Sequence, residues 1–166
     1  MTSAAAALRP YLAADAPVLA EIFQSSVEEL TGEDYDEAQQ AAWAGAADDL
    51  AAFAARLAGQ LTLVAVRGGN PVGFASLKGT DEIDMLYVDP AAAGQGIGTL
   101  LSSALERLAA SRGATRLVAD VSDTAEPFFR ARGYLPQRRN TVPLGGEWLA
   151  NTTMEKRLAP VQETRR

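Results

Sequence analysis

The middle of this chain of 166 residues places a strand, a glycine-rich loop, a helix and a second strand in succession. The first strand is expected over residues 82–88 and the helix over 96–112, where apolar side chains form one stripe that ends at Gly113. The second strand is expected over 115–121. Because two strands joined by a helix within one sheet require a right-handed crossover, this unit predicts a central parallel pair.

The remaining elements are predicted from their hydrophobic periodicity and their turn residues, and their strands are expected to be antiparallel. These strands are expected over 7–12, 61–67, 71–78, 134–142 and 147–158, and the helices between Asp15 and Thr31, over 35–58 and over 126–132. No linker long enough to separate two domains interrupts them. We therefore expect one domain over 1–166 of the α/β (α+β) class, with a mixed, mostly antiparallel sheet of six to seven strands and helices on both faces.

Composition excludes several classes of chemistry. The chain has no cysteine and no histidine, which removes disulfides, thiolate nucleophiles, Cys-based metal sites and any Ser-His-Asp triad. No clustered pattern of acidic ligands predicts a metal site. The net charge of −6 disfavours nucleic acid as a partner. Because the N-terminus lacks signal-peptide features and no run of about 18 apolar residues occurs, we expect a cytoplasmic protein without membrane contact.

Three glycines, Gly94, Gly96 and Gly98, lie between the central strand and its helix. Glycine lets a ligand approach the backbone closely, and the first N–H groups of a helix carry partial positive charge without an internal partner. The segment therefore favours a pyrophosphate-bearing ligand, with a flexible turn at a helix start as the alternative. A Walker loop fits less well because no lysine follows Gly98, and a dinucleotide fingerprint fits less well because Thr99 stands where its third glycine belongs.

Residues 88–98 resemble motif A of the GNAT superfamily of N-acetyltransferases, written Arg/Gln-x-x-Gly-x-Gly/Ala after a strand. Gly96 and Gly98 match its two small residues, whereas Ala93 departs from the Arg/Gln position. Residues 125–134 resemble the later family segment A-x-x-F-Y-x-x-x-G-F, and residues 154–158 resemble its last strand. The Ala-x-Pro-Phe-Phe variant is similar to a bacterial branch whose physiological substrates are mostly unassigned.

The resemblance implies transfer of an acetyl group from acetyl-CoA to a primary amine of a small molecule or peptide, by direct attack without a covalent enzyme intermediate. It implies that the backbone N–H of Leu86 polarises the acetyl carbonyl, that the N–H of Val88 holds the pantetheine arm, and that Ala93 keeps the backbone amide the family uses. Because proteins of this family often pair, a homodimer is a further expectation. The implied acetyl-CoA-binding residues are Leu86, Tyr87, Val88, Ala93, Gly94, Gln95, Gly96, Ile97, Gly98, Thr99, Ser122 and Phe129.

Acetyl transfer requires a neutral amine, and an amine with a pKa near about 10.4 is almost wholly protonated at neutral pH, so a positioned base accelerates the reaction. Glu82 and Asp84 are expected to share one strand face with Leu86 and Val88 if no bulge intervenes. The resemblance favours Glu82 as the base, because several family members keep a catalytic glutamate four residues before the position of Leu86. Asp84 is the second candidate, and the alternative for both is a solvated strand start.

For three side chains the sequence is compatible with both a functional and a structural role. Tyr87 is expected to point to the opposite strand face and pack there. Ser122 either bonds the pantetheine arm or caps the next helix. Phe129 occupies the position of the tyrosine that often protonates the leaving thiolate in the family, so Tyr35, Tyr134 or water must serve, or the thiolate leaves unaided.

Acceptor selection is expected from residues 31–60 and from the last hairpin. Trp43 and Trp148 either line an acceptor pocket or pack in a core or interface, and packing is favoured. An acidic cluster in the same region either attracts a cationic amine or forms a solvated helix start, and the second interpretation is favoured. The cluster comprises Glu33, Asp34, Asp36 and Glu37. The alternative functions are a non-catalytic acyl-CoA-binding module and a phosphate-ligand enzyme of another class.

Overall fold

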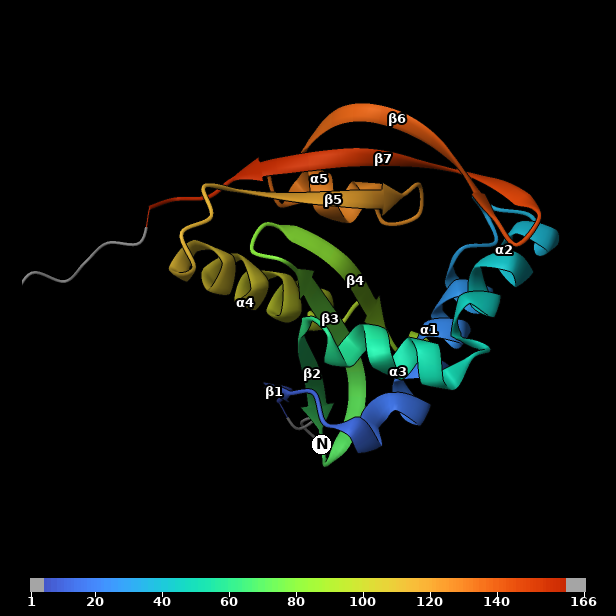
Figure 1. Cartoon of the computed structure of the whole chain (residues 1–166), viewed down its shortest axis with the longest axis horizontal. Helices are drawn as coiled ribbons and strands as arrows, with labels where there is room; N and C mark the ends of the chain where they lie inside the picture. The colour runs from blue at the N-terminus through green and yellow to red at the C-terminus, as the bar shows by residue number, and fades with distance from the viewer. Residues whose placement is uncertain (1–4, 161–166) are drawn as a thin grey trace, which may run out of the picture.

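One seven-stranded sheet forms the centre of the protein, in a computed structural model that describes residues 5–160. The strand order is β1-β2-β3-β4-β5-β7-β6 (Figure 1). The strands are β1 (Ala7–Pro10), β2 (Leu61–Arg67), β3 (Asn70–Lys78), β4 (Glu82–Val88), β5 (Arg116–Ser122), β6 (Leu135–Leu144) and β7 (Glu147–Arg157). Neighbouring strands are antiparallel except β4 and β5, which are parallel. The predicted mixed sheet with a central parallel pair is confirmed.

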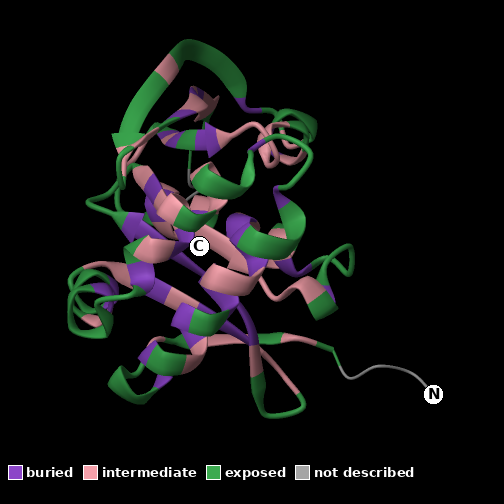
Figure 2. Cartoon of the chain, turned by 90° about the vertical axis from the view of Figure 1, so that its right-hand side faces the viewer, coloured by how far each residue is buried: buried purple, intermediate pink, exposed green. Residues whose placement is uncertain are grey.

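Helices cover both faces of this sheet, as predicted. They are α1 (Ala16–Leu30), α2 (Glu37–Ala44), α3 (Leu50–Ala58), α4 (Ile97–Ser111) and α5 (Glu126–Ala131). On one face Leu101 and Leu105 of α4 pack into a buried cluster, and on the other Phe23 of α1 and Phe53 of α3 do the same. The buried residues follow these two interfaces, whereas the outer strand β6 is mostly exposed (Figure 2). No helix between residues 5 and 160 combines the length and the apolar character needed to cross a membrane.

The helical region expected over 35–58 divides into α2 and α3 because two aspartates cap two separate helices. The Asp36 side chain accepts a hydrogen bond from the backbone N–H of Gln39 at 2.8 Å. The Asp49 side chain accepts one from the backbone N–H of Ala52 at 3.1 Å. These bonds satisfy N–H groups that a helix start leaves unpaired, and the 3-10 turn η2 (Gly45–Ala47) connects the two helices. Within the acidic cluster, Asp36 therefore serves as a helix cap.

The parallel strands β4 and β5 separate soon after they meet. They pair only at Glu82 with Val118 and at Ile83 with Ala119. Beyond Ile83, β4 continues to pair with β3, and β5 continues to pair with β7 (Figure 1). Within the part of the chain that the structure describes, the edge of β4 that faces β5 consequently has no strand partner over residues 84–88. The central parallel pair thus opens the sheet at its middle.

A β-bulge at Asp84 changes the side-chain alternation of β4. Ser76 of β3 pairs with Met85 while Leu77 pairs with Ile83, so Asp84 is the extra residue. Leu86 packs with the cluster around α4, as Ile83 does, whereas the Asp84 carboxylate bonds α3 on the opposite face. The sequence led us to expect Asp84 and Leu86 on one face of the strand, on the condition that no bulge intervened. The bulge is present, and it places these two side chains on different faces.

Candidate active site

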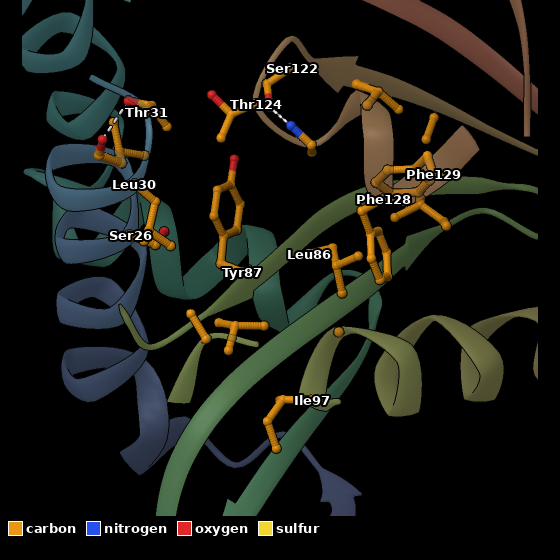
Figure 3. Close-up of a pocket in the computed structure, with 18 of the residues that line it drawn as sticks. Ser26, Leu30, Thr31, Leu86, Tyr87, Ile97, Ser122, Thr124, Phe128 and Phe129 are labelled. Carbon is orange, nitrogen blue, oxygen red and sulfur yellow. Dashed lines mark hydrogen bonds between the residues drawn. The ribbon is translucent and has the colours of Figure 1, made fainter. Parts of the chain in front are cut away.

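A cavity of about 710 Å³ lies where β4 and β5 diverge. Residues of α1, β4, the glycine loop, the start of α4, β5 and α5 line it (Figure 3). The predicted acetyl-CoA-binding residues that line this main cavity are Leu86, Tyr87, Val88, Ala93, Gly94, Gly96, Ile97, Gly98, Thr99, Ser122 and Phe129. Gln95 is the exception, because its side chain accepts from Arg67 of β2 and donates to the carbonyl of Ala91 at 3.3 Å.

The glycine loop ends in a helix N-terminus that no side chain of residues 5–160 caps. Gly94 and Gly96 have φ angles of 74° and 85°, in the left-handed region that favours glycine. Gly96 is the N-cap residue of α4 and offers no side-chain hydrogen bond to the first turn. The first N–H groups of this 15-residue helix are therefore available to a ligand in the cavity. Free amides at the positive end of a helix fit a pyrophosphate group.

Tyr87 combines packing with a position in the cavity. Its ring packs edge-on against Phe23, with 4.7 Å between centroids, as expected for a core side chain. Its hydroxyl nevertheless points toward Ser122 at the end of β5 and Thr124 in the turn that follows (Figure 3). The hydroxyl accepts a hydrogen bond from the indole Nε1 of Trp43 at 3.3 Å. Burial raises the pKa of Tyr87 to about 12, so this phenol stays protonated at neutral pH.

The two tyrosines considered as substitutes for Phe129 both have other partners. The hydroxyl of Tyr134 donates to Glu106 at 3.1 Å, and burial raises the pKa of Tyr134. The hydroxyl of Tyr35 donates to the carbonyl of Ala150 at 2.6 Å and accepts from the backbone N–H of Asp123 at 3.0 Å. Neither tyrosine lines the main cavity, where Tyr87 provides the phenol instead.

The two predicted catalytic carboxylates occupy different surroundings. Glu82 lies where β4 is still paired with β5 and is not among the residues that line the main cavity. Asp84 lines the cavity, but its carboxylate accepts from Arg56 Nε at 2.7 Å and from Gln60 Nε2 at 2.8 Å. Although burial raises the pKa of Asp84, the hydrogen bonds from Arg56 and Gln60 outweigh it and hold this pKa below its usual range. A carboxylate so paired is a poor proton acceptor.

Asp120 is a third carboxylate at the cavity, which the sequence reasoning missed. It lies on β5 two residues before Ser122, on the face opposite the buried Leu117 and Ala119. Its Oδ1 accepts a hydrogen bond from the hydroxyl of Thr153 at 2.6 Å. Asp120 shares a strand face with Ser122, because alternate residues of a strand point to the same side, and this alternation was the signal available in the sequence.

A smaller cavity of about 150 Å³ adjoins the main one beneath the β6–β7 hairpin. Trp43, Tyr87, Asp120 and Ser122 line both cavities. Trp43 therefore belongs to the site, whereas Trp148 is 62% exposed and lines neither cavity.

Two further predictions concern Ser122 and metals. Besides lining both cavities, Ser122 accepts at Oγ from the backbone N–H of Ala125 at 3.1 Å, which stabilises the turn before α5. It does not cap α5, because the N-cap residue is Ala125 and no side chain bonds the first turn of that helix within residues 5–160. Within the described part of the chain, no group of three or more His, Cys, Asp or Glu side chains is arranged to hold a metal ion.

These features coincide with a known enzyme family. The sequence profile described as "Acetyltransferase (GNAT) domain" matches residues 31–158, so the chain belongs to the GNAT acetyltransferases. It is 31% identical over 147 residues to the Escherichia coli K12 protein named "Uncharacterized N-acetyltransferase YafP", covering 89% of this chain and 93% of that protein. The predicted family and the predicted acetyltransferase activity are confirmed.

Solved structures agree with this membership. A GCN5-related N-acetyltransferase from Rhodopseudomonas palustris is 61% identical, with a TM-score of 0.92 and coverage of 95% of this chain and 99% of that one. The PaiA N-acetyltransferase from Thermoplasma acidophilum, solved with coenzyme A, is 18% identical with a TM-score of 0.77, covering 92% and 99%. At that identity the likeness of PaiA shows the fold alone.

Proposed function

We propose that this acetyltransferase transfers the acetyl group of acetyl-CoA to a primary amine of a small molecule or peptide by direct attack. The observation that supports the proposal most is that the uncapped N-terminus of α4 and the unpaired edge of β4 open onto one cavity. The chain has no cysteine or histidine to form a conventional acyl-enzyme. Direct attack on the bound thioester is the remaining chemistry that this site favours.

The backbone supplies the groups that would hold the donor. Amides of the glycine loop and of the first turn of α4 suit the pyrophosphate, and Ala93 contributes its backbone as the motif requires. The N–H groups of Leu86 and Val88 are proposed to bond the acetyl carbonyl and the pantetheine arm along the edge of β4 that lacks a strand partner. Acetyl-CoA itself supplies the activated thioester.

Asp120 is the carboxylate that we propose as the proton acceptor, directly or through water. It lines both cavities and forms no salt bridge among residues 5–160, whereas Asp84 is paired with Arg56. As the new N–C bond forms and the C–S bond breaks, one proton of the ammonium passes to Asp120 and then to solvent. A second proton ends on the sulfur of CoA. The catalytic roles predicted for Glu82 and Asp84 stay predictions, and the substitutions described at the end of this subsection test them together with Asp120.

Tyr87 is proposed to hydrogen-bond the departing sulfur rather than to protonate it. A thiol has a pKa of about 8.5, and the pKa of Tyr87 is raised to about 12, so proton transfer from this phenol to a thiolate is uphill. The thiolate of CoA is a sufficiently good leaving group to depart with only a hydrogen bond. Phe129 at the usual tyrosine position is then compatible with turnover.

The test is the rate of CoA release with a reactive amine over about pH 6 to 9 for Glu82→Gln, Asp84→Asn and Asp120→Asn. Asp120→Asn is expected to lower kcat/KM by about 100-fold and to flatten the pH dependence, as loss of a general base does. Asp81→Asn, an exposed carboxylate in the turn before β4, is the matched control. If Asp120→Asn kept full activity, Asp120 would not be the proton acceptor. That role would then fall to Glu82 or Asp84, whichever loses activity when it is substituted.

A further inference from the structure

The smaller cavity has a polar side, formed by Asp120, Ser122 and Asn151, and an apolar side. Val142, Leu144 and Leu149 of the β6–β7 hairpin contribute aliphatic side chains. Tyr35 and Trp43 contribute aromatic rings that pack edge-on, with 5.4 Å between their centroids. An apolar protein cavity of about 150 Å³ is large enough to hold a benzene molecule. The volume of this cavity, about 150 Å³, therefore matches one ring or a short branched alkyl group.

The junction of the two cavities suits a cation. Among the described residues that line them, none is lysine or arginine, and the acidic ones are Asp84 and Asp120. Asp84 is neutralised by Arg56, so Asp120 provides the uncompensated charge. Trp43 and Tyr87, whose rings attract cations, adjoin it in both cavities.

Asp120 is held in place by a row of polar side chains that crosses β7 to β6. Thr153 donates to Asp120 at 2.6 Å, and Asn140 Nδ2 donates to Thr153 at 2.8 Å and to Asn151 at 2.9 Å. The cation in this row, Arg138, donates from Nε to the side-chain oxygen Oδ1 of Asn140 at 2.8 Å. The row orients the carboxylate without neutralising it.

We propose that the acceptor is a primary amine whose body is one aromatic ring or similar apolar group, with no acid group beside the nitrogen. Its ammonium lies against Asp120 at the cavity junction, and its apolar body occupies the smaller cavity under the β6–β7 hairpin. The assignment rests on the proposed function and narrows its substrate class to arylalkylamine-like acceptors. A carboxylate next to the nitrogen would meet Asp120 with no lysine or arginine among the described residues that line the site, and would be rejected.

Three amines that differ in one group test the charge requirement. We expect kcat/KM to be about 100-fold higher for phenethylamine than for L-phenylalanine, because the latter brings an unpaired carboxylate to the site. L-phenylalaninamide, which lacks that charge, is expected to recover most of the difference. A preference for L-phenylalanine or for spermidine over phenethylamine would overturn the proposal and leave amine acetylation intact.

A cavity-filling variant tests the location of the apolar body. Val142→Phe narrows the smaller cavity from its rim, and it is expected to lower the ratio of kcat/KM for phenethylamine to that for ethylamine by about tenfold. Leu135→Phe on the same strand is the control, because Leu135 is 64% exposed and lines neither cavity. An unchanged ratio in Val142→Phe would place the body elsewhere and contradict the proposal.

A binding measurement separates failure of this proposal from failure of the proposed function. In Trp148→Phe the remaining tryptophan is Trp43, which lines both cavities. Its fluorescence is expected to titrate with phenethylamine and not with L-phenylalanine. Binding without acetylation of any amine would refute the proposed function alone, whereas acetylation of other amines without phenethylamine binding would refute the acceptor assignment alone.

Discussion

The indole of Trp43 donates a hydrogen bond to the hydroxyl of Tyr87 across 3.3 Å, at the place where the two cavities meet. Trp43 comes from α2 and Tyr87 from β4, so the bond joins the acceptor side of the site to the strand that we propose holds the donor. Because the indole occupies one lone pair of the phenol oxygen, the phenol proton is free to point into the cavity. This arrangement underlies the role proposed for Tyr87 at the departing sulfur.

Tyr87→Phe should reduce turnover, and it should cost about as much stability as its control because Nε1 of Trp43 loses its partner. The ring that packs on Phe23 remains, and the loss of one hydrogen bond, worth about 0.5–1.5 kcal/mol, corresponds to a fall in kcat of up to about tenfold. Tyr134→Phe is the matched control, because its hydroxyl bonds Glu106 away from both cavities. The control is expected to lose about 1 kcal/mol of stability at constant kcat. Equal kcat for wild type and Tyr87→Phe would remove the phenol from the mechanism.

Gly96→Ala should weaken binding of acetyl-CoA. Both Gly96 and Gly69 are left-handed, with φ of 85° and 82°, and a Cβ at either meets nothing within 4 Å. Alanine at either position is therefore expected to cost about 1–2 kcal/mol of stability from the backbone alone. Only Gly96→Ala is expected to raise KM for acetyl-CoA, by about tenfold, because only Gly96 begins the helix that would hold the phosphates. If Gly69→Ala raised KM equally, the effect would come from general destabilisation.

Asp84→Asn should lower stability in a pH-dependent way. The folded protein holds the pKa of Asp84 below its usual range, so the ionised carboxylate stabilises the fold above the unfolded pKa. That contribution is lost as pH falls through the lowered pKa. We expect the variant to be about 1–3 kcal/mol less stable at pH 7 and the difference to shrink below about pH 4, in urea unfolding followed at several pH values. A difference independent of pH would contradict this account of Asp84.

The sequence predicts the parts of the site that depend only on residues adjacent to one another in the chain. Gly94, Gly96 and Gly98 lie between strand and helix in the chain, so the loop and its cavity-facing backbone follow from local pattern. The bulge at Asp84 does not follow, because it depends on the register between β3 and β4. Nor does the smaller cavity, which forms where α2, β4 and β5 meet the β6–β7 hairpin. The role that we propose for Asp120 depends on that long-range packing.

The most direct test of the central proposal is to incubate the protein with acetyl-CoA and a panel of primary amines and to follow both products. We predict that CoA is released in step with an amine that gains one acetyl group by mass spectrometry. Gly96→Ala should require more acetyl-CoA for the same rate. Release of CoA without an acetylated amine, or binding of acetyl-CoA without turnover of any amine in the panel, would contradict acetyl transfer to an amine by this site.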